Sequence, residues 1–247
     1  MKKAYNLSEV LTTMMVIGII AAMTIPALYN VSIAEKNRTN LKKTFASYTI
    51  NIQQILASTG TICETLACTR HWSCRNPQED EDGNRVCDTK HNGALAQFKN
   101  FNYENCDDCV KKDSNLPAIM QNKEFSTYRL PNMAYASIYD YEGNCTTVIP
   151  ENSANNNNDT DTFRACSVMV LDVNGHKGPN TPCKDRYAFY VANQPYSRSE
   201  TVNGKDYNLV QTYLVPFGYN DVPNFESEDG YNCTAKVMYN NWKISKQ

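Results

Sequence analysis

The sequence predicts an α+β fold in which one long N-terminal helix packs on an antiparallel, disulfide-rich β-sheet head. Three features predict this fold. A helical pattern continues through the first 60 residues, and the alternation of apolar and polar residues that is typical of strands begins near residue 126. All ten cysteines follow the apolar run near the N-terminus.

That apolar run is uncharged over residues 10–28. A helix of this length spans roughly the 30 Å of a bilayer's hydrocarbon core. Lys2 and Lys3 precede the run and, by the positive-inside rule, keep the N-terminus in the cytoplasm. We therefore expect a single membrane-spanning segment, with a secretory signal peptide or a plain signal anchor as the alternatives.

One carboxylate, Glu9, lies at the edge of the apolar run. An ionised side chain in that position costs several kcal/mol in lipid unless it is paired. Its presence predicts a cationic partner in the functional state.

The N-terminal stretch KKAYNLSEVLTTMMVIGIIAAMTIPAL resembles the type IV pilin and type II secretion pseudopilin family. The resemblance implies that prepilin peptidase cleaves between Ala4 and Tyr5, where the family usually has glycine before the cut. It also implies that Tyr5 becomes the N-methylated terminus, whose amine pairs with Glu9 of a neighbouring subunit, and that Pro26 kinks the helix.

Beyond Pro26 an amphipathic pattern continues, and Gly60 is the expected stop of one helix over residues 5–59. The apolar stripe, expected to lie against the head, consists of Leu41, Phe45, Tyr48, Ile52 and Ile55. The basic residues off that stripe are Lys36, Arg38, Lys42 and Lys43.

Composition and the resemblance together divide the chain into five segments. In order, they are a prepilin leader (1–4), a transmembrane and filament-core helix (5–28), the amphipathic half of the helix (29–60), a Cys-rich insertion (61–125) and a β-sheet head (126–247). The strands expected in the head cover residues 135–141, 146–149, 166–173, 187–192 and 209–215.

An even number of cysteines on the non-cytoplasmic side favours disulfides. Ten cysteines allow about 945 pairings, nine times the 105 of eight, so the sequence leaves the connectivity open. The cysteines are Cys63, Cys68, Cys74, Cys87, Cys106, Cys109, Cys145, Cys166, Cys183 and Cys233. Candidate pairs are Cys63–Cys68, Cys74–Cys87, Cys145–Cys166 and Cys183–Cys233.

Two chemical alternatives exist for these cysteines. Cys106 and Cys109 have the spacing of a redox pair, but Asp107 and Asp108 between them oppose the lowered thiol pKa that redox chemistry needs. Zinc is the second alternative, although the spacing matches no zinc-ribbon pattern. Its candidate ligands are Cys63, Cys68, Cys74, Cys87, His71 and His91.

The stretch VLDVNGHKGPNTPCKDRYAFYV, residues 170–191, resembles a turn-and-loop signature of pseudopilin-like heads. Asp172, Asn174 and Asp185 place oxygen ligands around a tight loop, which suits calcium, the one cofactor that the residues suggest. In the alternative, Asp172 and Asn174 cap their own turn while Gly175 and Gly178 supply positive φ angles. The tail, residues 231–244, also resembles such heads, with Cys233 as a staple and Trp242 packed.

The expected function is structural. A net charge of −2 argues against a general nucleic-acid binder, and the sequence has no H-E-x-x-H, G-x-S-x-G or Walker motif of an enzyme. The resemblance implies a pilus or pseudopilus subunit in the bacterial inner membrane, with its head in the periplasm or outside the cell. Its partners would be other subunits, prepilin peptidase, the inner-membrane assembly platform and the bilayer. The alternative is a minor tip subunit whose Cys-rich head binds a secretion substrate, a surface or DNA.

Overall fold

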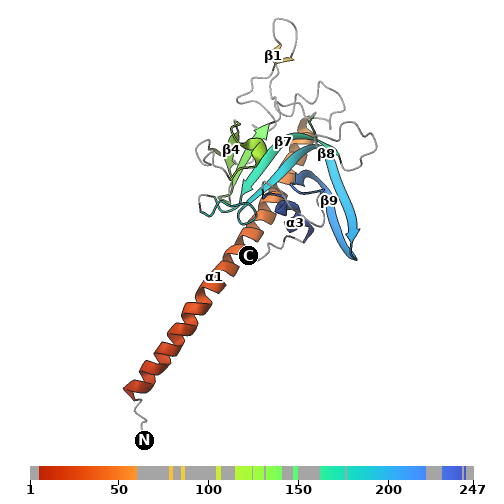
Figure 1. Ribbon diagram of the computed structural model, residues 1–247. Coiled ribbons are helices and arrows are strands. Elements are labelled where there is room, and N and C mark those ends of the chain that lie inside the picture. Colours follow the sequence, from red (N-terminus) through yellow and green to blue (C-terminus); the bar gives the residue numbers. More distant parts are fainter. Residues whose placement is uncertain are drawn as a thin grey trace.

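The computed structural model describes residues 6–59, 78–79, 85–86, 104–106, 115–123, 125–130, 132–140, 147–149, 162–175, 177–220, 230–240 and 242. Within these residues the architecture is a long helix and an antiparallel sheet, as expected (Figure 1).

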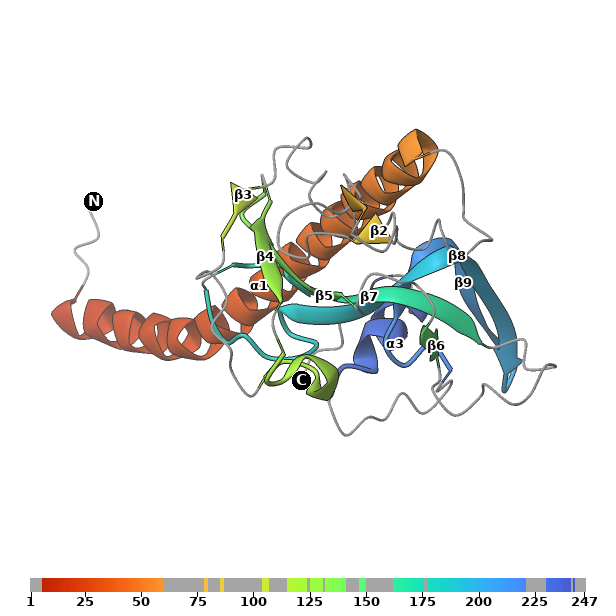
Figure 2. The same cartoon turned by 90° about the horizontal axis from the view of Figure 1, so that it is seen from above.

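Helix α1 (Leu7–Thr59) is 53 residues long and contains Pro26. It ends at the residue before Gly60, the predicted stop. Figure 2 shows that the helix changes direction between its free N-terminal half and the half that lies on the head. A bend of this kind is what an internal proline produces, because it removes one backbone donor and crowds the preceding turn.

Among the described residues the main sheet has seven strands in the order β3-β4-β5-β7-β8-β9, with β6 also paired to β7, and every pairing is antiparallel. The strands are β3 (Glu104–Asn105), β4 (Ser126–Arg129), β5 (Tyr135–Asp140), β6 (Thr147–Ile149), β7 (Phe163–Asp172), β8 (Arg186–Val202) and β9 (Lys205–Pro216). The remaining elements are the two-stranded pair β1 (Gln78–Glu79) and β2 (Arg85–Val86), the 3-10 helix η2 (Ala118–Met120) and helix α3 (Cys233–Tyr239).

The strand expected over residues 187–192 is much longer than predicted. β8 continues through Pro195 to Val202, and its register with β9 shifts on either side of Tyr196. A proline lacks the N–H that a ladder needs and is therefore unfavourable within a paired strand. The register shifts accommodate it, and β8 and β9 form a long hairpin closed by Asn203 and Gly204, both at positive φ.

Both faces of the sheet are covered. Met169 and Leu171 of β7 belong to the core that includes Leu41 and Tyr48 of α1. Val168, next along the same strand, belongs to a second core on the opposite face with residues that include Leu116, Met120, Phe217 and Tyr231. Because neighbouring residues of a strand point to opposite faces, β7 buries side chains on both faces, and seven of its ten residues are apolar.

Candidate assembly helix and the loop that docks on it

The N-terminal half of α1 carries a bare apolar surface. Large apolar side chains are exposed along it, among them Leu11 at 70%, Met23 at 75% and Leu28 at 68%. Among the described residues, α1 is the one helix that is long enough and apolar enough to cross a membrane. This half therefore has the length and composition of a membrane anchor.

The threonine hydroxyl groups of this half form hydrogen bonds within the helix. Thr12 Oγ1 donates to the Ser8 carbonyl at 2.7 Å, and Thr13 and Thr24 donate to carbonyls one turn earlier. A hydroxyl bonded in this way can enter an apolar environment without an unsatisfied donor. Glu9 differs, because it is exposed and forms no ion pair with any described residue. Ala4 and Tyr5, the expected processing residues, lie outside the described residues.

The second half of α1 buries its predicted apolar stripe on the head. Leu41, Tyr48 and Ile52 are buried, and Phe45 is partly buried against the same core. The ring of Phe45 lies 5.6 Å from Phe189 and 4.9 Å from Trp242, measured between ring centroids. These contacts confirm the expected packing of the stripe and of Trp242. The side chain of Ile55 lies outside the described residues.

Polar residues of α1, which sequence reasoning missed, join the helix to the head. Asn37 Nδ2 donates to the Lys184 carbonyl at 3.0 Å, and Asn40 Nδ2 donates to the Val173 carbonyl at 3.1 Å. Both carbonyls belong to the loop between β7 and β8. The spacing of Asn37, Asn40 and Leu41 on one helix face was a signal, since a polar residue in line with an apolar stripe is a candidate for a buried hydrogen bond.

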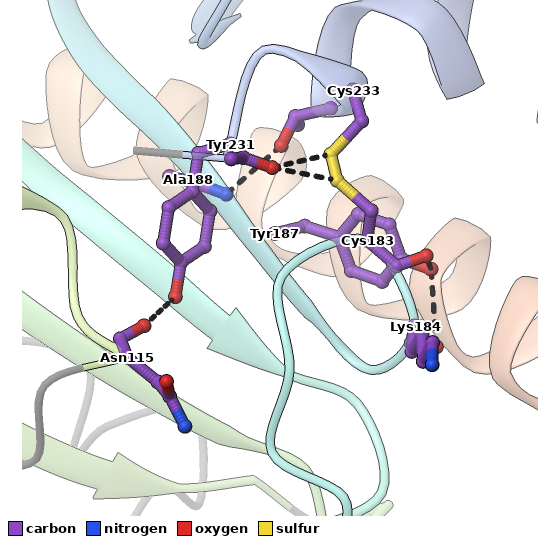
Figure 3. Close-up of a disulfide and its surroundings, with 9 residues drawn as sticks. Asn115, Cys183, Lys184, Tyr187, Ala188, Tyr231 and Cys233 are labelled. Carbon is purple, nitrogen blue, oxygen red and sulfur yellow. Dashed lines mark hydrogen bonds between the residues drawn. A yellow bond between two sulfur atoms is a disulfide. The ribbon is translucent and has the colours of Figure 1, made fainter. Parts of the chain in front are cut away.

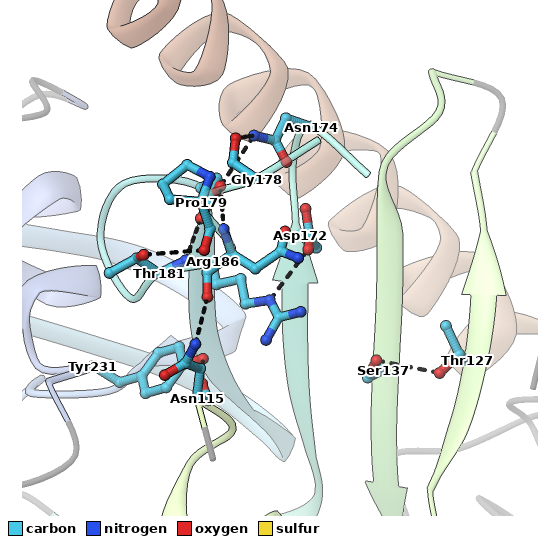
Figure 4. Close-up of polar contacts among 12 residues, drawn as sticks. Asn115, Thr127, Ser137, Asp172, Asn174, Gly178, Pro179, Thr181, Arg186 and Tyr231 are labelled. Carbon is cyan, nitrogen blue, oxygen red and sulfur yellow. Dashed lines mark hydrogen bonds and ion pairs between the residues drawn. The ribbon is translucent and has the colours of Figure 1, made fainter. Parts of the chain in front are cut away.

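That loop contains the predicted calcium ligands, and it begins with an ion pair (Figure 4). Asp172 Oδ2 accepts from Arg186 Nε at 3.1 Å, where both side chains are nearly fully buried and the two residues are cross-strand partners. Burial raises the pKa of Asp172 to about 6, although the Arg186 guanidinium opposes the rise. The charge of Asp172 is thus already balanced by a protein cation.

Asp185 closes the loop. This residue is fully buried, and its carboxylate accepts from Asn174 Nδ2 at 3.0 Å, from the Asn180 N–H at 2.8 Å and from the Thr181 N–H at 2.7 Å. Three N–H donors around one carboxylate hold the ends of the turn together. The structure therefore brings Asn174 to Asp185, while Asp172 pairs with Arg186.

The expected backbone geometry of the loop is half right. Gly175 has a positive φ of 68°, and a Cβ there would come within 2.6 Å of the Met133 carbonyl oxygen. Gly178 does not have a positive φ, so that prediction was wrong; Asn180 adopts the left-handed conformation instead. Asparagine tolerates this region because its short side chain can bond locally.

The residues fit calcium only in part. Buried oxygens of Asp172, Asn174 and Asn180 have no hydrogen-bond partner, and such oxygens are potential ligands. Against this, Arg186 neutralises Asp172 and both oxygens of Asp185 accept N–H groups. Among the described residues no cluster of three or more His, Cys, Asp or Glu side chains could hold a metal. The contacts favour turn capping, with Asp185 rather than Asp172 as the cap.

A disulfide attaches this loop to α3 (Figure 3). Cys183 is bonded to Cys233, with their Cα atoms 5.9 Å apart, and this confirms the candidate pair across the sheet. Nearby, the Tyr187 hydroxyl donates to the Cys183 carbonyl, and the Ala188 N–H donates to Thr234 Oγ1. The loop is therefore held by α1 on one side and by α3 on the other.

Two further described cysteines, Cys106 and Cys166, are also disulfide-bonded. No described cysteine is free. The other six cysteines and the three histidines lie outside the described residues, as does the zinc alternative built on them. Of the two cysteines of the redox alternative, Cys106 is disulfide-bonded and Cys109 lies outside the described residues.

Comparison of the chain with protein-family models, with curated proteins and with solved structures gives no match.

Proposed function

We propose that this chain is a structural subunit of a type IV pilus or a type II secretion pseudopilus, anchored in the bacterial inner membrane and assembled through α1. One observation carries the proposal. A single continuous helix is bare and apolar in its first half and buried under a folded head in its second half. A helix that only completed the head would have no need of the first half.

The bare half is suited to two apolar environments in succession. An apolar surface of this extent is stable in lipid or against other apolar helices, but not in water. Before assembly the bilayer would surround it, and after assembly the helices of neighbouring subunits would. The head, held to α1 by apolar packing and by Asn37 and Asn40, would move with the helix as one unit.

Glu9 supports assembly in trans. It has no partner ion within the described chain, so in an apolar bundle it needs a cation from elsewhere. Cleavage by prepilin peptidase after Ala4 would create that cation, the N-methylated amine of Tyr5 on a neighbouring subunit. The inner-membrane assembly platform would then bring the subunits together.

A pair of matched variants tests this proposal. Glu9→Ala should leave the chain in the membrane fraction but exclude it from filaments, because the buried pair is lost. Glu35→Ala, which removes an exposed carboxylate of the same helix, should preserve both properties. Fractionation and immunoblotting of sheared filaments measure both. Normal incorporation of Glu9→Ala would refute assembly by pairing in trans.

A minor tip subunit with a binding head would use the same helix. Glu9 favours the shaft, because a subunit at the tip has no neighbour above it to supply the paired amine. Copy number in sheared filaments separates the two, since a shaft subunit is present in many copies and a tip subunit in very few.

Calcium at Asp172, Asn174 and Asp185 stays a prediction. The unpartnered oxygens of Asp172, Asn174 and Asn180 support it. The donors on Asp185 and the guanidinium of Arg186 support the capping role instead. Thermal unfolding with and without calcium distinguishes them.

A further inference from the structure

One methionine lies on the surface of the head in an unfavourable backbone conformation. Met133, in the turn between β4 and β5, is 54% exposed, and among the described residues outside α1 it is the one large apolar side chain that is exposed. Its φ of 68° lies in the left-handed region, which residues with a Cβ rarely adopt. Neither burial nor backbone preference explains a methionine here, because glycine or asparagine would suit the turn better.

The sulfur of Met133 has a cationic neighbour. Arg129, the last residue of β4, donates from its Nη2 to Met133 Sδ at 3.0 Å. A thioether sulfur is a weak acceptor, so the guanidinium gains little from this bond. An oxygen added to the same sulfur is a stronger acceptor, and the guanidinium has five N–H donors on a flexible stem that can reach it. The contact therefore favours the oxidised form of the side chain.

The backbone of the turn does not depend on the Met133 side chain. The Met133 N–H donates to the Leu130 carbonyl at 2.9 Å. Asn132 joins the turn to α1, because its Nδ2 donates to Thr44 Oγ1 at 2.8 Å. A polar oxygen on the exposed sulfur would leave these bonds in place and enter no core, whereas oxidation of a buried methionine disrupts the packing around it.

Exposure makes Met133 the accessible methionine among the described residues of the head. Met120 and Met169 are buried, and Met238 is partly buried against two apolar clusters. Oxidants reach a sulfur at the surface sooner than a sulfur inside a core. The other described methionines belong to the apolar half of α1: Met14, Met15 and Met23.

We propose that Met133 is a site of oxidation by hydroperoxides and that Arg129 stabilises the sulfoxide that forms. A lone pair of the Met133 sulfur attacks the terminal oxygen of the hydroperoxide, so that an S–O bond forms as the O–O bond breaks. The proton of the transferred oxygen passes to the oxygen that leaves. The sulfur loses two electrons, and the hydroperoxide is reduced to water or to an alcohol. The head thus accepts this oxidation without a loss of packing.

Treatment of the full-length chain in detergent with hydrogen peroxide, followed by peptide mass spectrometry, locates the oxidised residues. Met133 should be oxidised at least about tenfold faster than Met120 and Met169, which react only in locally opened molecules. If these three residues are oxidised at equal rates, Met133 is not the preferred site in the head.

Thermal unfolding before and after oxidation, followed by circular dichroism, tests the role of Arg129. Oxidation should shift the melting temperature of the parent upward by about 2–4 °C relative to the shift in Met133→Leu, which subtracts the effect of every other methionine. Arg129→Leu should still be oxidised at Met133 but should lose this relative rise. The control Arg164→Leu, which removes an exposed arginine of β7, should keep it.

Equal shifts in the parent and in Met133→Leu would refute a stabilised sulfoxide. A rise that persists in Arg129→Leu would show that another group stabilises it and would overturn the role of Arg129. All of these outcomes concern the head alone, so they are independent of assembly through α1.

Discussion

Asn37, near the middle of the long helix, donates its side-chain amide to the main-chain carbonyl of Lys184, which lies 147 residues further along the chain. This bond, with that of Asn40 to the Val173 carbonyl, joins the helix to the loop between β7 and β8. The same loop is bonded to α3 through Cys183 and Cys233. This loop thus connects the helix, the sheet and α3, in addition to the apolar packing of Leu41 and Tyr48 on the head.

Asn37→Ala should therefore weaken the docking of the head. The Lys184 carbonyl would lose the Asn37 amide at 3.0 Å and keep only the longer contact with the Tyr187 hydroxyl at 3.4 Å, so the free energy of unfolding should fall by about 1 kcal/mol. Urea unfolding of the full-length chain in detergent, followed by circular dichroism, measures the change. Gln53→Ala, on an exposed face of the same helix, should have an effect of less than about 0.5 kcal/mol. Equal effects of the two variants would contradict the docking role.

The capping role of Asp185 predicts a loss of stability that does not depend on calcium. Asp185→Ala leaves the N–H groups of Asn180 and Thr181 without an acceptor, so the free energy of unfolding should fall by about 2–5 kcal/mol. Asp206→Ala, at the exposed tip of the β8–β9 hairpin, should cost less than about 1 kcal/mol.

The effect of added calcium on the melting temperature distinguishes the capping role from a calcium site. With Asp185 acting as the cap, millimolar calcium should leave the melting temperature of the parent unchanged. A rise in the melting temperature that disappears in Asp172→Ala would establish the calcium site and would contradict a role of the loop carboxylates in capping alone.

The buried pair of Asp172 and Arg186 predicts a specific dependence of stability on pH. Burial raises the pKa of Asp172 from 3.8 to about 6, so the folded state binds a proton more tightly than the unfolded state. The stabilisation from this group is complete below about pH 4 and is lost as the pH rises through about 6. The stability of the parent relative to Asp172→Asn should fall by up to about 3 kcal/mol between pH 4 and pH 7.

Denaturant unfolding of both chains across this range measures that difference. The exposed variant Asp206→Asn provides the control, and its difference from the parent should stay nearly flat. If the free energy of unfolding of the parent minus that of Asp172→Asn stays constant or grows with pH, the pKa of Asp172 is not raised.

Local patterns were sufficient for α1 and for strands β5, β6 and β7. α1 ends where Gly60 predicted, and β5, β6 and β7 begin or end within three residues of their expected positions. These elements are defined by the spacing of neighbouring apolar residues, which a short window of sequence contains. The continuation of β8 beyond Pro195 was missed because it depends on pairing with β9, a partner that no local window includes.

The sequence by itself determined that the chain has one membrane-compatible helix, an amphipathic continuation and an antiparallel head, since each follows from periodicity and composition. Only the tertiary structure decided that Cys183 pairs with Cys233, that Asn37 and Asn40 bond the β7–β8 loop, and that Asp185 caps this loop while Asp172 pairs with Arg186. The reason is physical. A pairing among ten cysteines, or the choice of partner for a carboxylate, depends on which distant segments meet, and that is settled by the packing of the whole chain.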